Sequence, residues 1–118
     1  MTRFLLATDS VHATAAGCDY LADRIDGDDA VVALTVLEST GPERERDAAD
    51  ALNVATVRLP GQTETARREG TPAPAILEAA RERDADEIVL VAAESGVSST
   101  VRAVLTDADR PVVVVRSA

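Results

Sequence analysis

Unbroken apolar runs alternate along this chain with segments of helical periodicity. The runs Arg3–Ala7, Ala30–Glu38, Glu87–Ala93 and Arg110–Arg116 each predict a buried strand. Apolar residues fill these runs instead of alternating with polar ones, which is typical of strands covered on both faces of a parallel sheet. The stretch Thr63–Arg68 is polar with weak alternation, and its pattern fits either an edge strand or a loop.

The segments between these runs predict helices with recognisable beginnings. Asp9 or Ser10 provides an N-cap for the first helix. Its apolar side would hold Val11, Ala15, Cys18, Leu21, Ala22 and Ile25. After the turn at 26–29 and the next strand, the hydroxyls of 39–40 and then Pro42 open a second helix, which Leu59–Gln62 would end. The apolar side of this helix would hold Ala48, Ala51, Leu52 and Ala55.

Two further helices complete the alternation. Thr71 is a cap candidate, with Pro72 at the first helical position, where its missing N–H has no intrahelical partner. A short helix follows over 98–109. Strands and helices alternate throughout, and the sequence contains no repeat or linker. We therefore expect residues 1–118 to form one doubly wound α/β domain with helices on both faces of the sheet.

The charge balance disfavours several classes of partner. The chain has 21 acids and 12 bases, all of them arginine, with a net charge of −9. Nucleic acids and anionic membranes bind through basic patches, so we expect neither as a partner. No apolar run is long enough to cross a membrane and no secretion leader is recognisable, which favours a cytoplasmic protein.

The acidic, lysine-free composition has two explanations. One is a solubilising surface, and the other is a salt-rich cytoplasm in which repulsion between acids is screened. The absence of lysine favours the second, halophilic explanation. The single cysteine, Cys18, cannot form an internal disulfide and is expected to be a buried structural thiol.

Four stretches resemble the universal stress protein family over the whole chain. They are the first strand with its terminal acid Asp9, "LTVLE", "EGTPAPAILEAARERDADEIVLV" and "VLTDADRPVVVVR". In the last stretch, Arg110–Pro111 stands where the family usually has Cys-Pro. The resemblance implies a five-stranded parallel sheet in the order 3-2-1-4-5 and a homodimer. In one branch of the family it also implies binding of an adenine nucleotide.

The resemblance also suggests where a nucleotide would bind. Asp9 and Val36 correspond to residues beside the adenosine, and Ser98–Ser99 match the last pair of the phosphate loop. Gly96 is the only glycine between the fourth strand and that pair, so the loop is a truncated form of the family's. Glu94 would repel a phosphate.

Two hypotheses remain for the function. The first is a regulatory module that does not catalyse and does not bind nucleotide strongly. The alternative is a protein that binds ATP or AMP with Mg²⁺, through the loops after strands one and four, which flank the point where the strand order reverses. Its candidate contacts are Asp9, Ser10, Val36, Gly96, Ser98 and Ser99.

Two other features have simpler explanations than catalysis or a metal. Asp9, Ser10 and His12 carry the residue types of a hydrolase triad, but such closely spaced side chains diverge at a helix start. His12 is the only histidine, and no cysteine–histidine cluster exists to bind a metal. We therefore expect helix capping at Asp9–Ser10 and a surface histidine.

The four consecutive valines Val112, Val113, Val114 and Val115 would form an edge strand in the implied order. An apolar, β-branched edge invites pairing with another chain, although the last helix could instead cover it. The resemblance implies that this strand joins two subunits, so we expect a symmetric homodimer through it.

Overall fold

A computed structural model of the chain describes residues 1–59 and 63–117. Five strands form one parallel sheet in the order β3-β2-β1-β4-β5. The strands are β1 (Arg3–Ala7), β2 (Ala30–Leu37), β3 (Thr63–Glu69), β4 (Glu87–Ala92) and β5 (Val112–Arg116). The helices are α1 (Val11–Ala22), α2 (Pro42–Arg58), α3 (Pro72–Glu82) and α4 (Ser99–Asp107). This architecture confirms the fold class and strand order expected from the sequence.

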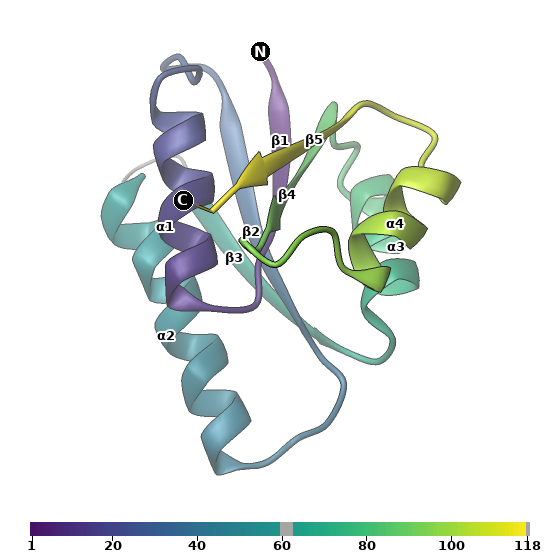
Figure 1. Cartoon of the computed structure of the whole chain (residues 1–118). Helices are drawn as coiled ribbons and strands as arrows, with labels where there is room; N and C mark the ends of the chain where they lie inside the picture. Colours follow the sequence, from purple (N-terminus) through teal and green to yellow (C-terminus); the bar gives the residue numbers. More distant parts are fainter. Residues whose placement is uncertain (60–62, 118) are drawn as a thin grey trace.

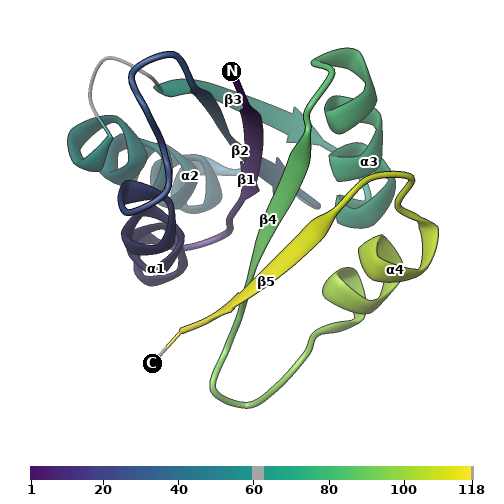
Figure 2. The same ribbon diagram turned by 90° about the horizontal axis from the view of Figure 1, so that it is seen from above.

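The helices cover both faces of the sheet. Figures 1 and 2 show α1 and α2 on one face and α3 and α4 on the other. The chain crosses from β1 to β2 and β3 in one direction, and then returns across the sheet to β4 and β5. Right-handed crossovers that run in the same direction across a sheet place their helices on the same face. The reversal of direction therefore produces the two helix layers.

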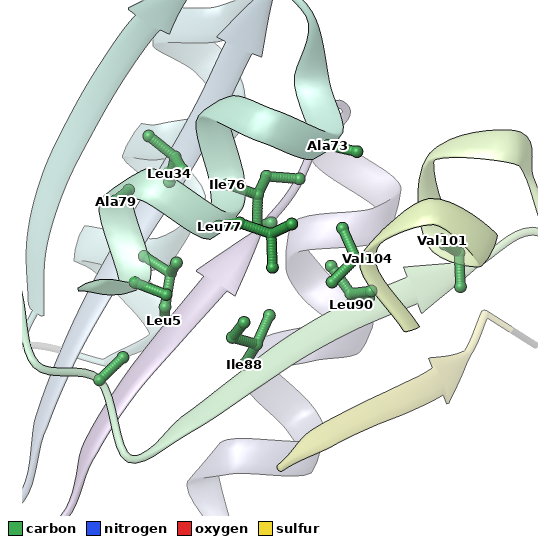
Figure 3. Close-up of a cluster of buried hydrophobic side chains, with 13 residues drawn as sticks. Leu5, Leu34, Ala73, Ile76, Leu77, Ala79, Ile88, Leu90, Val101 and Val104 are labelled. Atoms are coloured by element: carbon green, nitrogen blue, oxygen red, sulfur yellow. The ribbon is translucent and has the colours of Figure 1, made fainter. Parts of the chain in front are cut away.

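Small aliphatic side chains fill the two cores. On the α3–α4 face, Ile76 and Leu77 of α3 and Val104 of α4 lie over Ile88 and Leu90 of β4 (Figure 3). On the opposite face, the buried cluster includes residues from β1, β2, β4, α1 and α2: Phe4, Leu6, Cys18, Leu21, Val31, Ala33, Ala55, Leu59 and Val89. Burial on both faces explains the unbroken apolar runs of the central strands.

The polar segment that fitted either a strand or a loop is the edge strand β3. It pairs in parallel with β2 along its whole length. Ion pairs attach it to α3: Arg68 to Glu82 and, at 3.4 Å, to Glu78, and Glu64 to Arg83. A charged edge of this kind also discourages pairing with other chains.

The expected hydroxyl cap of α2 is wrong, whereas the expected cap of α3 is confirmed in position. The N-cap of α2 is Gly41, with φ of 152°, and no hydroxyl side chain caps this helix. Thr71 occupies the N-cap position of α3 but makes no side-chain capping bond. The proline that follows each cap occupies the start of its helix as expected. Of the predicted break after α2, residues 60–62 lie outside the described residues.

The buried side of α1 also differs from the expected one. Val11 is 48% exposed and Ala22 is exposed, whereas Thr14, Gly17, Cys18 and Leu21 are buried. The helix approaches the sheet at Gly17, where an added Cβ would lie 2.5 Å from Leu6 Cδ1. A glycine and a threonine carry little weight in a hydrophobic pattern, so the pattern could not identify this contact line. The expected burial of Cys18 is confirmed, and burial raises the pKa of its thiol to about 11.

Candidate ligand site

A cavity lies at the carboxyl ends of the parallel strands β1 and β4. From β1 the chain continues toward one edge of the sheet, and from β4 it continues toward the other edge. The volume of the cavity is about 170 Å³. This point of reversal is where open α/β sheets generally bind ligands. We call it the central cavity, and it is lined by Ala7, Thr8, Asp9, Ala13, Leu34, Val36, Ile76, Leu90, Val91, Ser98, Thr100 and Val101.

Two hollows adjoin the central cavity and share Asp9 with it. The β4–α4 hollow, about 250 Å³, is lined by Asp9, Ser10, His12, Ala13, Val91, Ala93, Ser95, Gly96, Val97, Ser98 and Ser117. The β2–α2 hollow, about 300 Å³, is lined by Asp9, Thr35, Val36, Leu37, Glu38, Arg44, Asp47, Ala48, Pro72 and Thr100. Asp9 therefore stands where the three spaces meet.

A buried hydroxyl network fixes the turn that carries Asp9. Thr14 Oγ1 donates to the carbonyl oxygen of Ser10 at 2.7 Å and lies 2.8 Å from Thr8 Oγ1. The backbone N–H of Thr8 donates to the carbonyl oxygen of Leu34 at 2.9 Å, which ties the same turn to β2. Thr8 and Thr14 are both buried, so these bonds are shielded from competing water.

The loop between β4 and α4 forms a tight turn before the helix begins. Gly96 has φ of 119°, and its N–H donates to the carbonyl oxygen of Ala93 at 3.0 Å. Ser98 then caps α4, with Oγ accepting from the N–H of Val101 at 3.2 Å. The N–H groups of Ser99 and Thr100 belong to the first turn and have no intrahelical acceptor.

The two hollows differ in charge. The β2–α2 hollow contains the carboxylates of Asp9, Glu38 and Asp47 and the guanidinium of Arg44. In the β4–α4 hollow, Asp9 and His12 are the ionisable side chains among the described lining residues. Nowhere in the described ranges do three or more histidine, cysteine or acidic side chains group as metal ligands would.

The fold brings most of the expected site residues to these three spaces. Asp9, Val36 and Ser98 line the central cavity, whereas Ser10 and Gly96 line the β4–α4 hollow. Ser99 begins α4, is exposed and lines none of the three. The sequence did not point to several lining residues, namely Thr8, Arg44, Ile76 and Leu90. Thr8 could have been predicted as a lining residue because it directly follows β1. Nothing in the sequence pattern indicates that Ile76 of α3 lies at this edge.

The capping explanation for the residues after β1 is confirmed. Ser10 Oγ accepts from the N–H of Ala13 at 3.1 Å and caps α1. The Ser10 hydroxyl is therefore engaged with its own helix, whereas a hydrolase triad would need it free to act as a nucleophile.

In the part of the chain that the structure describes, no helix is both long and apolar enough to cross a membrane.

A family model decides the relationship of this chain to known proteins. The model described as "Universal stress protein family" matches residues 1–116. The chain belongs to the universal stress protein family. A search of curated proteins found no match.

Solved structures of other universal stress proteins share this fold. One from Archaeoglobus fulgidus in complex with dAMP is 20% identical, with a TM-score of 0.77 and 98% of each chain covered. One from Arabidopsis thaliana with AMP bound is 15% identical, with a TM-score of 0.75 and coverage of 100% of this chain and 93% of that one. A third, in complex with cAMP, is 18% identical, with a TM-score of 0.77 and coverage of 99% and 98%. At these identities the likeness establishes the fold.

Proposed function

We propose that this chain is a non-catalytic stress-response module whose central cavity binds an adenine mononucleotide with modest affinity. The observation that carries the proposal is that Asp9, Val36 and Ser98 line one cavity at the reversal point of the sheet. Three structural neighbours were solved with dAMP, AMP and cAMP. In this proposal the nucleoside occupies the central cavity, with Asp9 as an acceptor for the exocyclic amine.

The lining of the cavity suits a nucleoside. Apolar side chains such as Val36, Ile76 and Leu90 form most of its walls and would cover the faces of a base. Asp9, Ser98 and Thr100 provide a small number of polar groups at the rim, and such a combination is typical of small-molecule sites.

The β4–α4 loop supports binding of one phosphate in preference to three. Gly96 uses its N–H inside the turn, which leaves the N–H groups of Ser99 and Thr100 at the start of α4. The helix dipole adds about 0.3–1 kcal/mol for an anion there. Asp9 and Glu94 oppose further negative charge. A triphosphate accompanied by Mg²⁺ is the weaker alternative.

Calorimetric titration with adenosine, AMP, cAMP and ATP, the last with and without Mg²⁺, tests this proposal. AMP and cAMP should bind, and ATP should bind no more tightly. Val36→Phe should fill the central cavity and abolish binding, whereas Val57→Phe, at an exposed position on α2, should not. Absence of binding by both adenosine and AMP at millimolar concentration would overturn the proposal.

We further propose that the module works as a symmetric dimer through Val112–Val115. In the described sheet, β5 pairs only with β4, so one side of its backbone faces outward. All four valines are only half-buried, although Val112, Val114 and Val115 pack against the two cores. An edge of this kind is a ready template for a second copy.

The dimer is tested by changing Val113 and Val115 to lysine. We expect the double variant to elute as a monomer in size-exclusion chromatography, because two charges would be buried at the interface. A matched double variant on the polar edge, Thr65→Lys with Glu69→Lys, should leave the assembly unchanged. A dimer that persists in the first variant would place the interface elsewhere.

We also propose that the protein works in a salt-rich cytoplasm, as its net charge of −9 and lack of lysine suggest. Screening of acid repulsion should then stabilise the fold, because the Debye length shrinks to about 3 Å at 1 M salt. The melting temperature should be higher in molar than in millimolar KCl. An unchanged melting temperature would contradict this proposal.

A further inference from the structure

His12 is the one histidine of the chain and has no part in the network that builds the turn after β1. It lies in the first turn of α1, is exposed, and lines the β4–α4 hollow. Ser10, its neighbour in the cap, is engaged with the N–H of Ala13. The imidazole of His12 therefore lies at the edge of the β4–α4 hollow, and none of the contacts that stabilise the turn after β1 uses it.

We propose that His12 contacts the phosphate of the bound mononucleotide and that protonation of its imidazole tightens binding. The inference rests on the proposed function and extends it. It adds a contact from the strand 1 loop to the phosphate contacts offered by the start of α4, and it makes affinity for the nucleotide depend on pH.

The charges of the two hollows decide where the phosphate goes. Three carboxylates face the single guanidinium of Arg44 in the β2–α2 hollow. The β4–α4 hollow contains one carboxylate, that of Asp9, together with His12 and the side chains of Ser95 and Ser98. Since a phosphate is repelled by carboxylates and accepts hydrogen bonds from hydroxyl and imidazole groups, the β4–α4 hollow is the more favourable of the two.

Asp9 is the other ionisable side chain that faces this hollow among the described residues. It comes from the β1–α1 turn, whereas β4, the β4–α4 loop and Ser117 contribute only neutral groups to the lining. Glu94, Arg102 and Arg116 are exposed nearby in the sequence and do not line it. Among the described residues, His12 contributes the one imidazole to this hollow, and an imidazole is the side chain that most often acts as a pH-dependent cation in proteins.

Cyclic AMP and adenosine, titrated calorimetrically at pH 5.5 and 8.0, separate this effect from ionisation of the ligand. The cyclic phosphodiester keeps the same single negative charge over this range, and adenosine has no phosphate. We expect cAMP to bind about 3- to 5-fold more tightly at pH 5.5, the size of a solvent-exposed charge pair. Adenosine should bind equally at both values.

Variants at position 12 make the test specific. His12→Gln should remove the pH dependence and keep the weaker affinity, whereas His12→Lys should bind cAMP tightly at both pH values. Arg102→Gln, which removes a nearby charge outside the lining, should retain the wild-type pH dependence. If wild-type protein binds cAMP with no pH dependence, or His12→Gln keeps it, the role of His12 is overturned while the proposed function stands. If none of cAMP, AMP and adenosine binds, the proposed function itself fails.

Discussion

Thr8 Oγ1 and Thr14 Oγ1 lie 2.8 Å apart, in the interior between the end of β1 and the first turns of α1. Thr14 is fully buried and also donates to the carbonyl oxygen of Ser10. These bonds join a strand end, a turn and a helix beside the central cavity. The position of Asp9 therefore depends on the hydroxyl group of Thr14, which does not itself line that cavity.

Replacing Thr14 by valine should destabilise the protein by about 1–3 kcal/mol, because the polar atoms of Thr8 and Ser10 lose a buried partner. Thr14→Ser keeps the hydroxyl and removes one methyl group, which should cost only about 0.8 kcal/mol. Urea unfolding measures both. A valine variant as stable as the serine variant would show that the network contributes little.

Gly17→Ala should also destabilise the fold, because the new Cβ would lie 2.5 Å from Leu6 Cδ1 and Leu6 is fully buried. Overpacking typically costs about 1–3 kcal/mol, which outweighs the roughly 1 kcal/mol that alanine gains over glycine in a helix. Thermal unfolding provides the measurement. Gly27→Ala is the matched control, since nothing lies within 4 Å of its added Cβ. A Gly17→Ala protein that melts above wild type would mean that Leu6 can repack.

Arg110 joins α3 to the segment before β5. Its guanidinium donates to the carbonyl oxygens of Ala80 at 3.0 Å and Ala85 at 2.8 Å. Arg110→Gln should lower the free energy of unfolding by about 1.5–3 kcal/mol, the usual contribution of a hydrogen bond to a charged group. Arg102 makes no side-chain hydrogen bond or ion pair among the described residues, so Arg102→Gln should change the free energy of unfolding little. Equal losses in the two variants would indicate a general charge effect.

Asp29 should make part of the stability pH-dependent. Its carboxylate accepts from the N–H of Thr2 at 2.7 Å and of Asp26 at 2.9 Å. These bonds, chiefly the one from Asp26, hold the pKa of the Asp29 carboxyl below its ordinary 3.8. The stabilisation is therefore complete above the unfolded pKa and is lost as the pH falls through the lower folded value.

NMR titration of the side-chain carboxyl carbons tests this directly. The Asp29 carboxyl should titrate below its ordinary pKa of 3.8. In urea unfolding, Asp29→Asn should lose less stability than wild type between pH 6 and pH 3, and Asp28→Asn should behave as wild type. If Asp29 titrates at its ordinary pKa, the backbone bonds do not persist in solution.

The sequence by itself determined the alternation of elements, the parallel sheet and the edge of the sheet at which the candidate site residues lie. Buried strands must be apolar on both sides, so the runs at β1, β2 and β4 could be read directly. The resemblance to a family then supplied the strand order. The resemblance also pointed to Asp9, Val36 and Ser98, which line one cavity because parallel strands end together at that edge.

Only the tertiary structure decided which surfaces meet. α1 packs through Thr14 and Gly17, whose identities carry no hydrophobic signal, because close approach to Leu6 requires small residues. Residues 63–69 form a strand because they hydrogen-bond to β2 and make ion pairs with α3, and these contacts join residues far apart in the chain. Ile76 reached the central cavity because three-dimensional packing, and not local pattern, brings α3 to the ends of the strands. His12 lies beside it because α1 begins directly after β1.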